Sequence, residues 1–125
     1  MKKCAFDSSM SERVTSYAPY ILMLYSADSR QRKSLLKSMT WKQQRALCEV
    51  ILNVYKGTFP LSKYYLKRLL PYRNAIHKLS SGKVKKSDKR RILLKNHLML
   101  PIVIKPALKV LKNVSRVDTE TAGKI

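Results

Sequence analysis

Hydrophobic side chains recur at helical spacing in the middle of the chain. The clearest series is spaced at i, i+3, i+4 and i+7 and consists of Leu47, Val50, Ile51 and Val54. This spacing predicts a helix over residues 41–57 with one apolar face. Thr40 and Gln43 form a capping-box pattern at its start, and Gly57 is a typical stop signal at its end.

A second apolar series predicts that another helix follows after a tight connection. Residues 62–79 carry this series, which consists of Tyr65, Leu66, Leu69, Leu70, Ile76 and Leu79. Pro71 interrupts it and should break or kink the helix. Shorter helical patterns cover residues 30–39 and 88–99. We therefore expect an all-α fold, a small bundle of three to five short helices, with 41–57 and 62–79 as its core hairpin and with flexible termini.

The charge balance indicates that this helical bundle binds a polyanion. The 125 residues include 27 Lys+Arg and 7 Asp+Glu, a formal net charge of +20. Residues 1–28 are neutral and residues 118–125 carry −1, so residues 29–117 carry +21. So many like charges in one small domain repel each other, and this is typical of proteins that work beside a polyanion. The 45% hydrophobic content excludes a protamine-type tail, and the length excludes a large enzyme.

These composition shifts divide the chain into four parts. We expect a near-neutral N-terminal segment able to form a helix (1–28), a basic helical nucleic-acid-binding domain (29–95), an apolar, proline-containing segment with spaced lysines (96–112) and a flexible tail (113–125). Cys4 and Cys48 are too sparse for a disulfide scaffold. The apolar run at 18–25 is too short for a secretion signal, so we expect a protein that is not secreted.

Catalytic and metal-binding patterns are missing from the sequence. His77 and His97 are the only histidines, and each lies among basic residues. Glu49 is the only carboxylate between Asp28 and Asp88, so no carboxylate pair is available for acid–base chemistry. No phosphate-binding loop, dinucleotide fingerprint or Cys/His metal spacing occurs. We expect a non-enzymatic protein without cofactor or metal.

The basic residues give the strongest functional signal. Residues 83–91 hold six cations and one acid, and Lys95 follows one turn later. Lysines outnumber arginines by 18 to 9, which favours phosphate contacts over base reading. We predict largely sequence-independent binding of nucleic acid, with double-stranded DNA favoured. The predicted contact residues are Lys63, Lys67, Arg68, Arg73, Lys78, Lys83, Lys85, Lys86, Lys89, Arg90, Arg91 and Lys95.

Two other functions remain open at this point. The helices flanking residues 57–61 fit a helix-turn-helix regulator, although Pro71 interrupts the second one. The segment 96–112 alternatively fits a membrane interface or the docking surface of a partner, or it closes the helical core. Its predicted contact residues are Leu98, Leu100, Ile102, Val103, Ile104, Leu108 and Leu111. Self-association of the protein also remains open.

The segment over residues 46–62, ALCEVILNVYKGTFPLS, resembles a signature of small basic proteins encoded by animal Polinton and adintovirus elements. The resemblance extends over residues 30–112, and the C-terminal half is similar to the adenovirus core protein X, or mu. It implies a virion core component that condenses viral DNA, located in the virion core and the host nucleus, with capsid proteins as partners and a membrane-active tail. The sequence departs from the family where Asn96 and His97 replace a glycine pair and where Lys105 and Lys109 interrupt the tail.

Overall fold

The computed structural model describes residues 11–57, 59 and 61–113, and every regular element among them is helical. The all-α class is therefore confirmed. Seven α-helices and three 3-10 turns lie wholly within the described residues, more segments than predicted. In chain order they are α2 (Glu12–Ser26), α3 (Ser29–Lys37), α4 (Trp41–Tyr55), α5 (Lys63–Leu69), η1 (Leu70–Tyr72), α6 (Arg73–Ser80), α7 (Lys86–Lys95), η2 (His97–Met99), α8 (Leu100–Ile104) and η3 (Lys105–Ala107), and residues 108–113 continue as helix.

Local signals in the sequence set where these helices begin and end. The predicted capping box at α4 is present, since Thr40 Oγ1 accepts from the Gln43 amide at 3.1 Å and Gln43 Oε1 accepts from the Thr40 amide at 2.9 Å. Gly57 ends this helix region with a φ of +77°, a conformation that favours glycine. Pro71 lies in η1 and divides the predicted 62–79 helix into α5 and α6, which confirms the predicted break.

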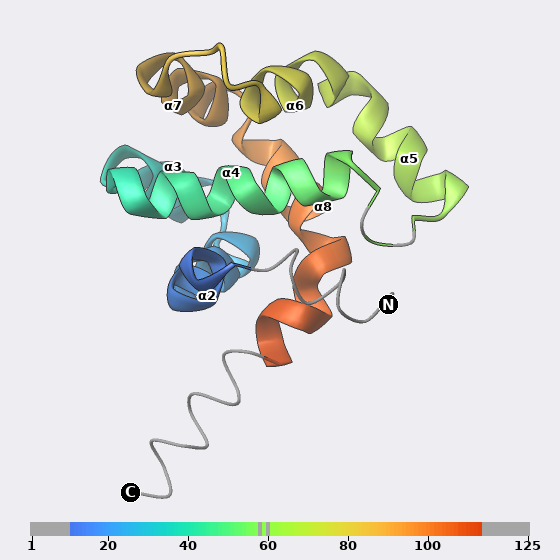
Figure 1. Cartoon of the computed structure of the whole chain (residues 1–125), viewed down its shortest axis with the longest axis horizontal. Helices are drawn as coiled ribbons and strands as arrows, with labels where there is room; N and C mark the ends of the chain where they lie inside the picture. Colours follow the sequence, from blue (N-terminus) through green and yellow to red (C-terminus); the bar gives the residue numbers. More distant parts are fainter. Residues whose placement is uncertain (1–10, 58, 60, 114–125) are drawn as a thin grey trace, which may run out of the picture.

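Helix α4 is the centre of the fold. Figure 1 shows α4 crossing the molecule, with α5, α6 and α7 forming a layer on one side, α2 on the other, and α8 running behind it. The apolar stripe of α4 is fully buried, including Leu47, Val50 and Ile51. Its main packing partners are α6 and α2, with α8 next to both α4 and α2.

The predicted core hairpin is only half present. Helix α6 packs on α4 through Ile76 and Leu79, as expected. In α5 only Leu69 is buried, whereas Leu66 and Leu70 have 48% and 58% of their surface exposed. Leu66 on α5 and Leu70 at the start of η1 remain at the surface because no described element covers them.

The two segments that we predicted to flank the domain instead complete its core. Helix α2 buries Val14, Ala18, Ile21 and Leu24, so residues 12–26 belong to the folded body. The 96–112 segment buries six side chains completely or almost completely: Met99, Leu100, Val103, Ile104, Ala107 and Leu111. The sequence divisions at residues 28 and 96 are therefore not structural boundaries. Nearly all of the predicted 113–125 tail lies outside the described residues.

None of the helices in the described part of the chain is long and apolar enough to cross a membrane.

Candidate nucleic-acid interface

The twelve predicted contact residues occupy one layer of the fold but not one continuous patch. Figure 1 shows α5 and α7 at opposite ends of the layer above α4, with α6 between them. We call one group the α5 patch; it consists of Lys63, Lys67, Arg68 and Arg73. We call the other the α7 patch; it consists of Lys83, Lys85, Lys86, Lys89, Arg91 and Lys95. Lys78 lies on α6 between the two, and Arg90 has a different role.

The α7 patch is held against α4 by a hydrogen bond from a buried side chain. The Gln44 side chain, which is almost fully buried, donates to the Lys86 carbonyl at 2.8 Å and fixes the first turn of α7. Most cations of the patch are exposed, while Lys89 is half-buried at its inner edge. Arg91 donates to Asp88 at 3.0 Å in an exposed pair, which is worth little in stability and offsets one positive charge.

An exposed tryptophan lies beside this patch. The Lys86 ammonium is 4.4 Å from the centre of the Trp41 ring, and the Arg45 guanidinium is 5.7 Å from it. Both distances are within the range of cation–π contacts. Trp41 is 43% exposed, so part of its ring remains available for contact with a ligand between the two cations.

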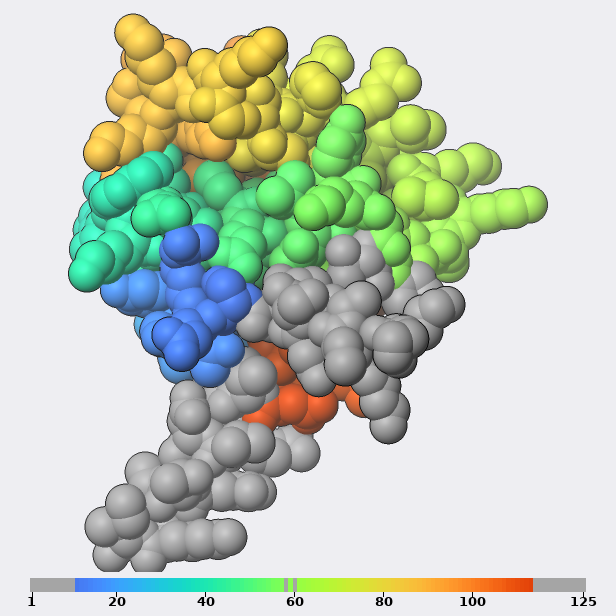
Figure 2. All heavy atoms as spheres, in the orientation of Figure 1, coloured from blue at the N-terminus to red at the C-terminus, as the bar shows by residue number. Residues whose placement is uncertain are grey.

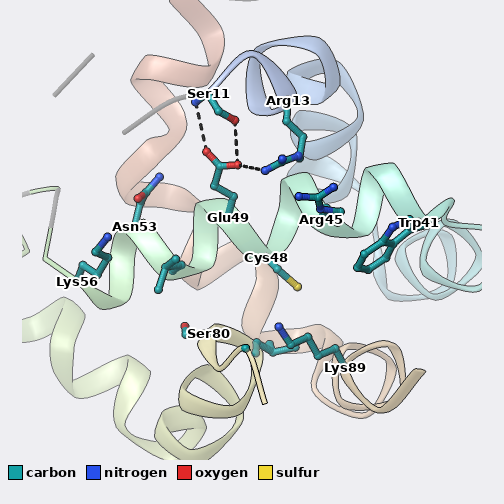
Figure 3. Close-up of a pocket in the computed structure, with 13 residues that line it drawn as sticks. Ser11, Arg13, Trp41, Arg45, Cys48, Glu49, Asn53, Lys56, Ser80 and Lys89 are labelled. Carbon is teal, nitrogen blue, oxygen red and sulfur yellow. Dashed lines mark hydrogen bonds and ion pairs between the residues drawn. The ribbon is translucent and has the colours of Figure 1, made fainter. Parts of the chain in front are cut away.

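A groove of about 660 Å³ continues from Trp41 along the outer face of α4. Figure 3 shows Arg45, Cys48, Glu49, Asn53 and Lys56 projecting from α4 into this region, with Arg13 on one side and Lys89 on the other. The space-filling view places the groove between the α6–α7 layer and the start of α2 (Figure 2).

Glu49, the one carboxylate among the described residues that line the groove, is already neutralised. Glu49 accepts from Arg13 at 2.8 Å, from the Ser11 hydroxyl at 2.9 Å and from the Ser11 amide at 3.3 Å. This network leaves Arg45, Lys56 and Lys89 as excess positive charge along the groove. The groove can therefore accept anionic groups such as phosphates next to the α7 patch.

Sequence reasoning missed Arg45 and Lys56 because each is isolated along the chain. Their spacing contained a usable signal, since residues 45, 49, 52 and 56 follow one another at helical intervals opposite the apolar stripe of α4. A search for basic residues by helix face, instead of by runs, would have added both to the candidate site.

Arg90, one of the predicted contact residues, has a structural role that the prediction did not include. Its guanidinium donates to the carbonyls of Leu36 at 3.2 Å and Met39 at 2.6 Å, at the end of α3. Carbonyls at a helix C-terminus lack partners within the helix, so a donor from another element stabilises them. Arg90 thus joins α7 to α3 through bonds that occupy both ends of its guanidinium.

Arg32 has a similar structural role. It is buried and donates to the carbonyls of Leu24, at 3.0 Å, and Ala27. Burial lowers the pKa of its guanidinium, while the nearby Asp28 carboxylate acts in the opposite direction. The charge of Arg32 therefore stabilises the connection between α2 and α3 instead of the outer surface.

Groups that could perform chemistry are few in the described part of the chain. Burial raises the pKa of the Cys48 thiol, and the nearby Lys89 opposes this only in part, so the net pKa is about 11. The thiol is therefore protonated near neutral pH. Burial and the neighbouring Lys33 and Arg32 lower the pKa of His97. The described residues hold no group of three or more His, Cys, Asp or Glu side chains placed to bind a metal.

The predicted membrane- or partner-contact set does not form a surface. Leu100, Val103, Ile104 and Leu111 are fully buried within the protein, and Ile102 and Leu108 are partly buried. Only Leu98, at 56%, is largely exposed. The apolar residues of 96–112 pack against α2 and α4, so this fold does not offer them to a membrane or a partner.

Comparisons with protein-family models, with curated proteins and with solved structures gave no match to this chain.

Proposed function

We propose that this protein is a non-enzymatic, largely sequence-independent binder of double-stranded DNA that condenses it, acting as a minor core component of a virion. The observation that supports this most strongly is the uncompensated charge of the α7 patch and the adjoining groove. Among the described residues the ion pairs within 4 Å are Arg13–Glu49 and Arg91–Asp88, which leave most of the surface cations without a carboxylate.

The arrangement of the patches suggests how condensation would work. Lysine ammonium groups act as point charges on phosphates and carry little sequence information. The α7 and α5 patches lie at opposite ends of one layer, so a single molecule can contact two neighbouring DNA segments (Figure 1). Bridging of this kind would draw duplexes together without a specific site.

The viral part of the proposal depends on the resemblance of residues 46–62 to Polinton and adintovirus proteins. In the structure residues 46–55 of this stretch form the last two thirds of α4, and Ser62 is the N-cap of α5. The resemblance favours the virion core and the host nucleus as locations, and capsid proteins as further partners.

Salt dependence of duplex binding tests the mechanism. We expect the affinity to fall by at least about two orders of magnitude between roughly 50 and 200 mM salt, because each phosphate contact releases counterions. The triple variant Lys83→Gln, Lys85→Gln, Arg91→Gln should reduce the slope of log affinity against log salt by about one per contact removed.

A matched triple variant controls for net charge alone. Lys105→Gln, Lys109→Gln, Lys112→Gln removes the same charge from exposed positions on the opposite side of the fold, and it should change the slope less. Equal slopes for the two triple variants would reject the α7 patch as the binding surface. Strong preference for one labelled site over unrelated competitor DNA would instead favour the helix-turn-helix regulator.

A further inference from the structure

A second groove lies between the C-terminal end of α4 and the α5–α6 segment, and its walls are mainly apolar. It encloses about 770 Å³ and includes Tyr55, Leu61, Leu66, Leu69, Leu70 and Ile76. We propose that this groove binds an acidic, amphipathic segment of a partner protein. In Figure 2 the side chains of α5 project from this edge of the molecule.

The exposed side chains of the groove are larger and more apolar than a solvated helix face requires. Leu66 and Leu70 expose 48% and 58% of their surface, and Tyr55 exposes 49%. These residues lie together around one hollow instead of being scattered singly. A contiguous exposed apolar patch is typical of an interaction site.

The rim of the groove determines the charge of the expected occupant. Lys63, Lys67 and Arg73 line it, and none of the other described residues around it is acidic. All three are exposed, and none forms an ion pair within the described structure. A segment with large apolar side chains on one face and carboxylates along its flanks would satisfy both the hollow and the rim.

Charge and shape disfavour three other occupants of the groove: a second copy of this chain, a nucleic acid and a membrane. A second copy of this chain carries the same +20, and pairing α5 with α5 would bring the cations of two α5 patches together. Leucine side chains provide no flat ring for stacking on nucleobases. A hollow with walls from α4 and from α5–α6 also fits protruding side chains better than the flat surface of a bilayer.

The groove lies far enough from the α7 patch for a protein segment and DNA to be bound together. It lies at the α5 end of the layer, whereas the α7 patch lies at the other end (Figure 1). On the proposed function, the α7 patch could hold DNA while the groove holds an acidic protein segment. Lys63, Lys67 and Arg73 belong to both the groove rim and the α5 patch, so the bound segment would displace DNA from the α5 patch and replace the bridging of two duplexes. The docking itself does not depend on DNA binding.

A synthetic peptide provides the direct test. The probe is a labelled amphipathic helix of about 16 residues, with Leu and Phe at i, i+3, i+4 and i+7 and Glu at most other positions. Its binding to the full-length protein is followed by fluorescence anisotropy at physiological salt. A scrambled peptide of identical composition measures non-specific charge attraction.

Substitutions at exposed positions identify the site without disturbing the core. Leu66→Ser combined with Leu70→Ser should weaken binding at least about tenfold, because both leucines would be covered by the peptide. Leu98→Ser is the matched control, since Leu98 is similarly exposed but lies outside the groove, and it should leave the affinity unchanged. Lys63→Gln with Lys67→Gln should also weaken binding and reduce its salt dependence.

Several results would overturn the proposal: no binding of the peptide, equal binding of the scrambled peptide, or no effect of the leucine pair. Binding of phosphatidylserine-containing vesicles that is lost in the leucine variant, with no peptide binding, would assign the groove to a membrane instead. The leucine variant should retain DNA binding with its salt slope, so failure here is distinguishable from failure of the proposed function.

Discussion

The segments around α5 and α8 both carry apolar side chains at helical spacing, but several of these side chains are exposed in the first segment, whereas most are buried in the second. The pattern of α5 predicted half of the core hairpin, yet Leu66 and Leu70 are largely exposed. The pattern around α8 predicted a surface for a membrane or partner, yet Leu100 and Ile104 are fully buried. The comparison shows that apolar spacing defines a face of a helix, whereas burial depends on whether another element covers that face.

The largest expected effect is the difference in stability between substituting a buried leucine of α8 and substituting an exposed leucine in η1, directly after α5. Leu100→Ala should lower the free energy of unfolding by about 2–5 kcal/mol, because it leaves a cavity beneath α2 and α4. Leu70→Ala should change it by no more than about 0.5 kcal/mol, since Leu70 is mostly exposed. Urea unfolding followed by circular dichroism measures both. Similar losses in the two variants would mean that α5 is covered in solution.

The same distinction applies to two adjacent arginines on α7. Arg90→Gln should cost about 1–3 kcal/mol of stability, because the carbonyls of Leu36 and Met39 lose their charged donor. Arg91→Gln should cost at most about 0.5 kcal/mol, since its pair with Asp88 is exposed.

Duplex binding by the same two variants, measured at a temperature where both are folded, separates the roles further. Arg91→Gln should lower the salt slope by about one, whereas Arg90→Gln should leave it unchanged. A reduced slope for Arg90→Gln would return this residue to the phosphate-binding set.

A smaller effect concerns the N-terminal caps of α4 and α5. Thr40→Ala should cost about 1 kcal/mol of global stability, because it removes the capping box of the central helix. Ser62→Ala removes the cap of α5, where fraying exposes few buried groups, and should mainly increase hydrogen exchange within α5. An equal loss of global stability in both variants would show that α5 folds as part of the core.

These contrasts explain which parts of the fold could be predicted from sequence. The Thr40 capping box, the Gly57 stop and the Pro71 break are encoded by residues a few positions apart, and the structure has all three. The coverage of α4 by α2 and α8 depends on contacts between distant segments. Periodicity does not encode those contacts, so both ends of the body were predicted to be peripheral.

The candidate site also has residues that could be predicted from the sequence and residues that only the packing of the helices brings in. The 83–95 run is visible as a local excess of charge, and its lysines lie together on and beside α7. Arg45 and Lys56 join it only because α4 packs next to α6 and α7. The role of Arg90 could not be predicted, because its two partner carbonyls are more than 50 residues away along the chain.

The smallest expected effect is a pH dependence that arises from His97, at the start of η2. Its pKa in the folded protein is lowered from 6.5 by burial and by Lys33 and Arg32. Below about pH 6.5 the unfolded chain therefore binds a proton at His97 that the folded chain binds less readily, so stability falls as the pH decreases through this value. Thermal unfolding of the wild type should show a small decrease in Tm between about pH 7.5 and 5.5, above the usual range of carboxylate titration. His97→Gln should remove most of this decrease, whereas His77→Gln, at an exposed position, should retain it. A decrease that persists in His97→Gln would mean that another group is responsible, and that the segment joining α7 to α8 is less enclosed than the packing of α8 indicates.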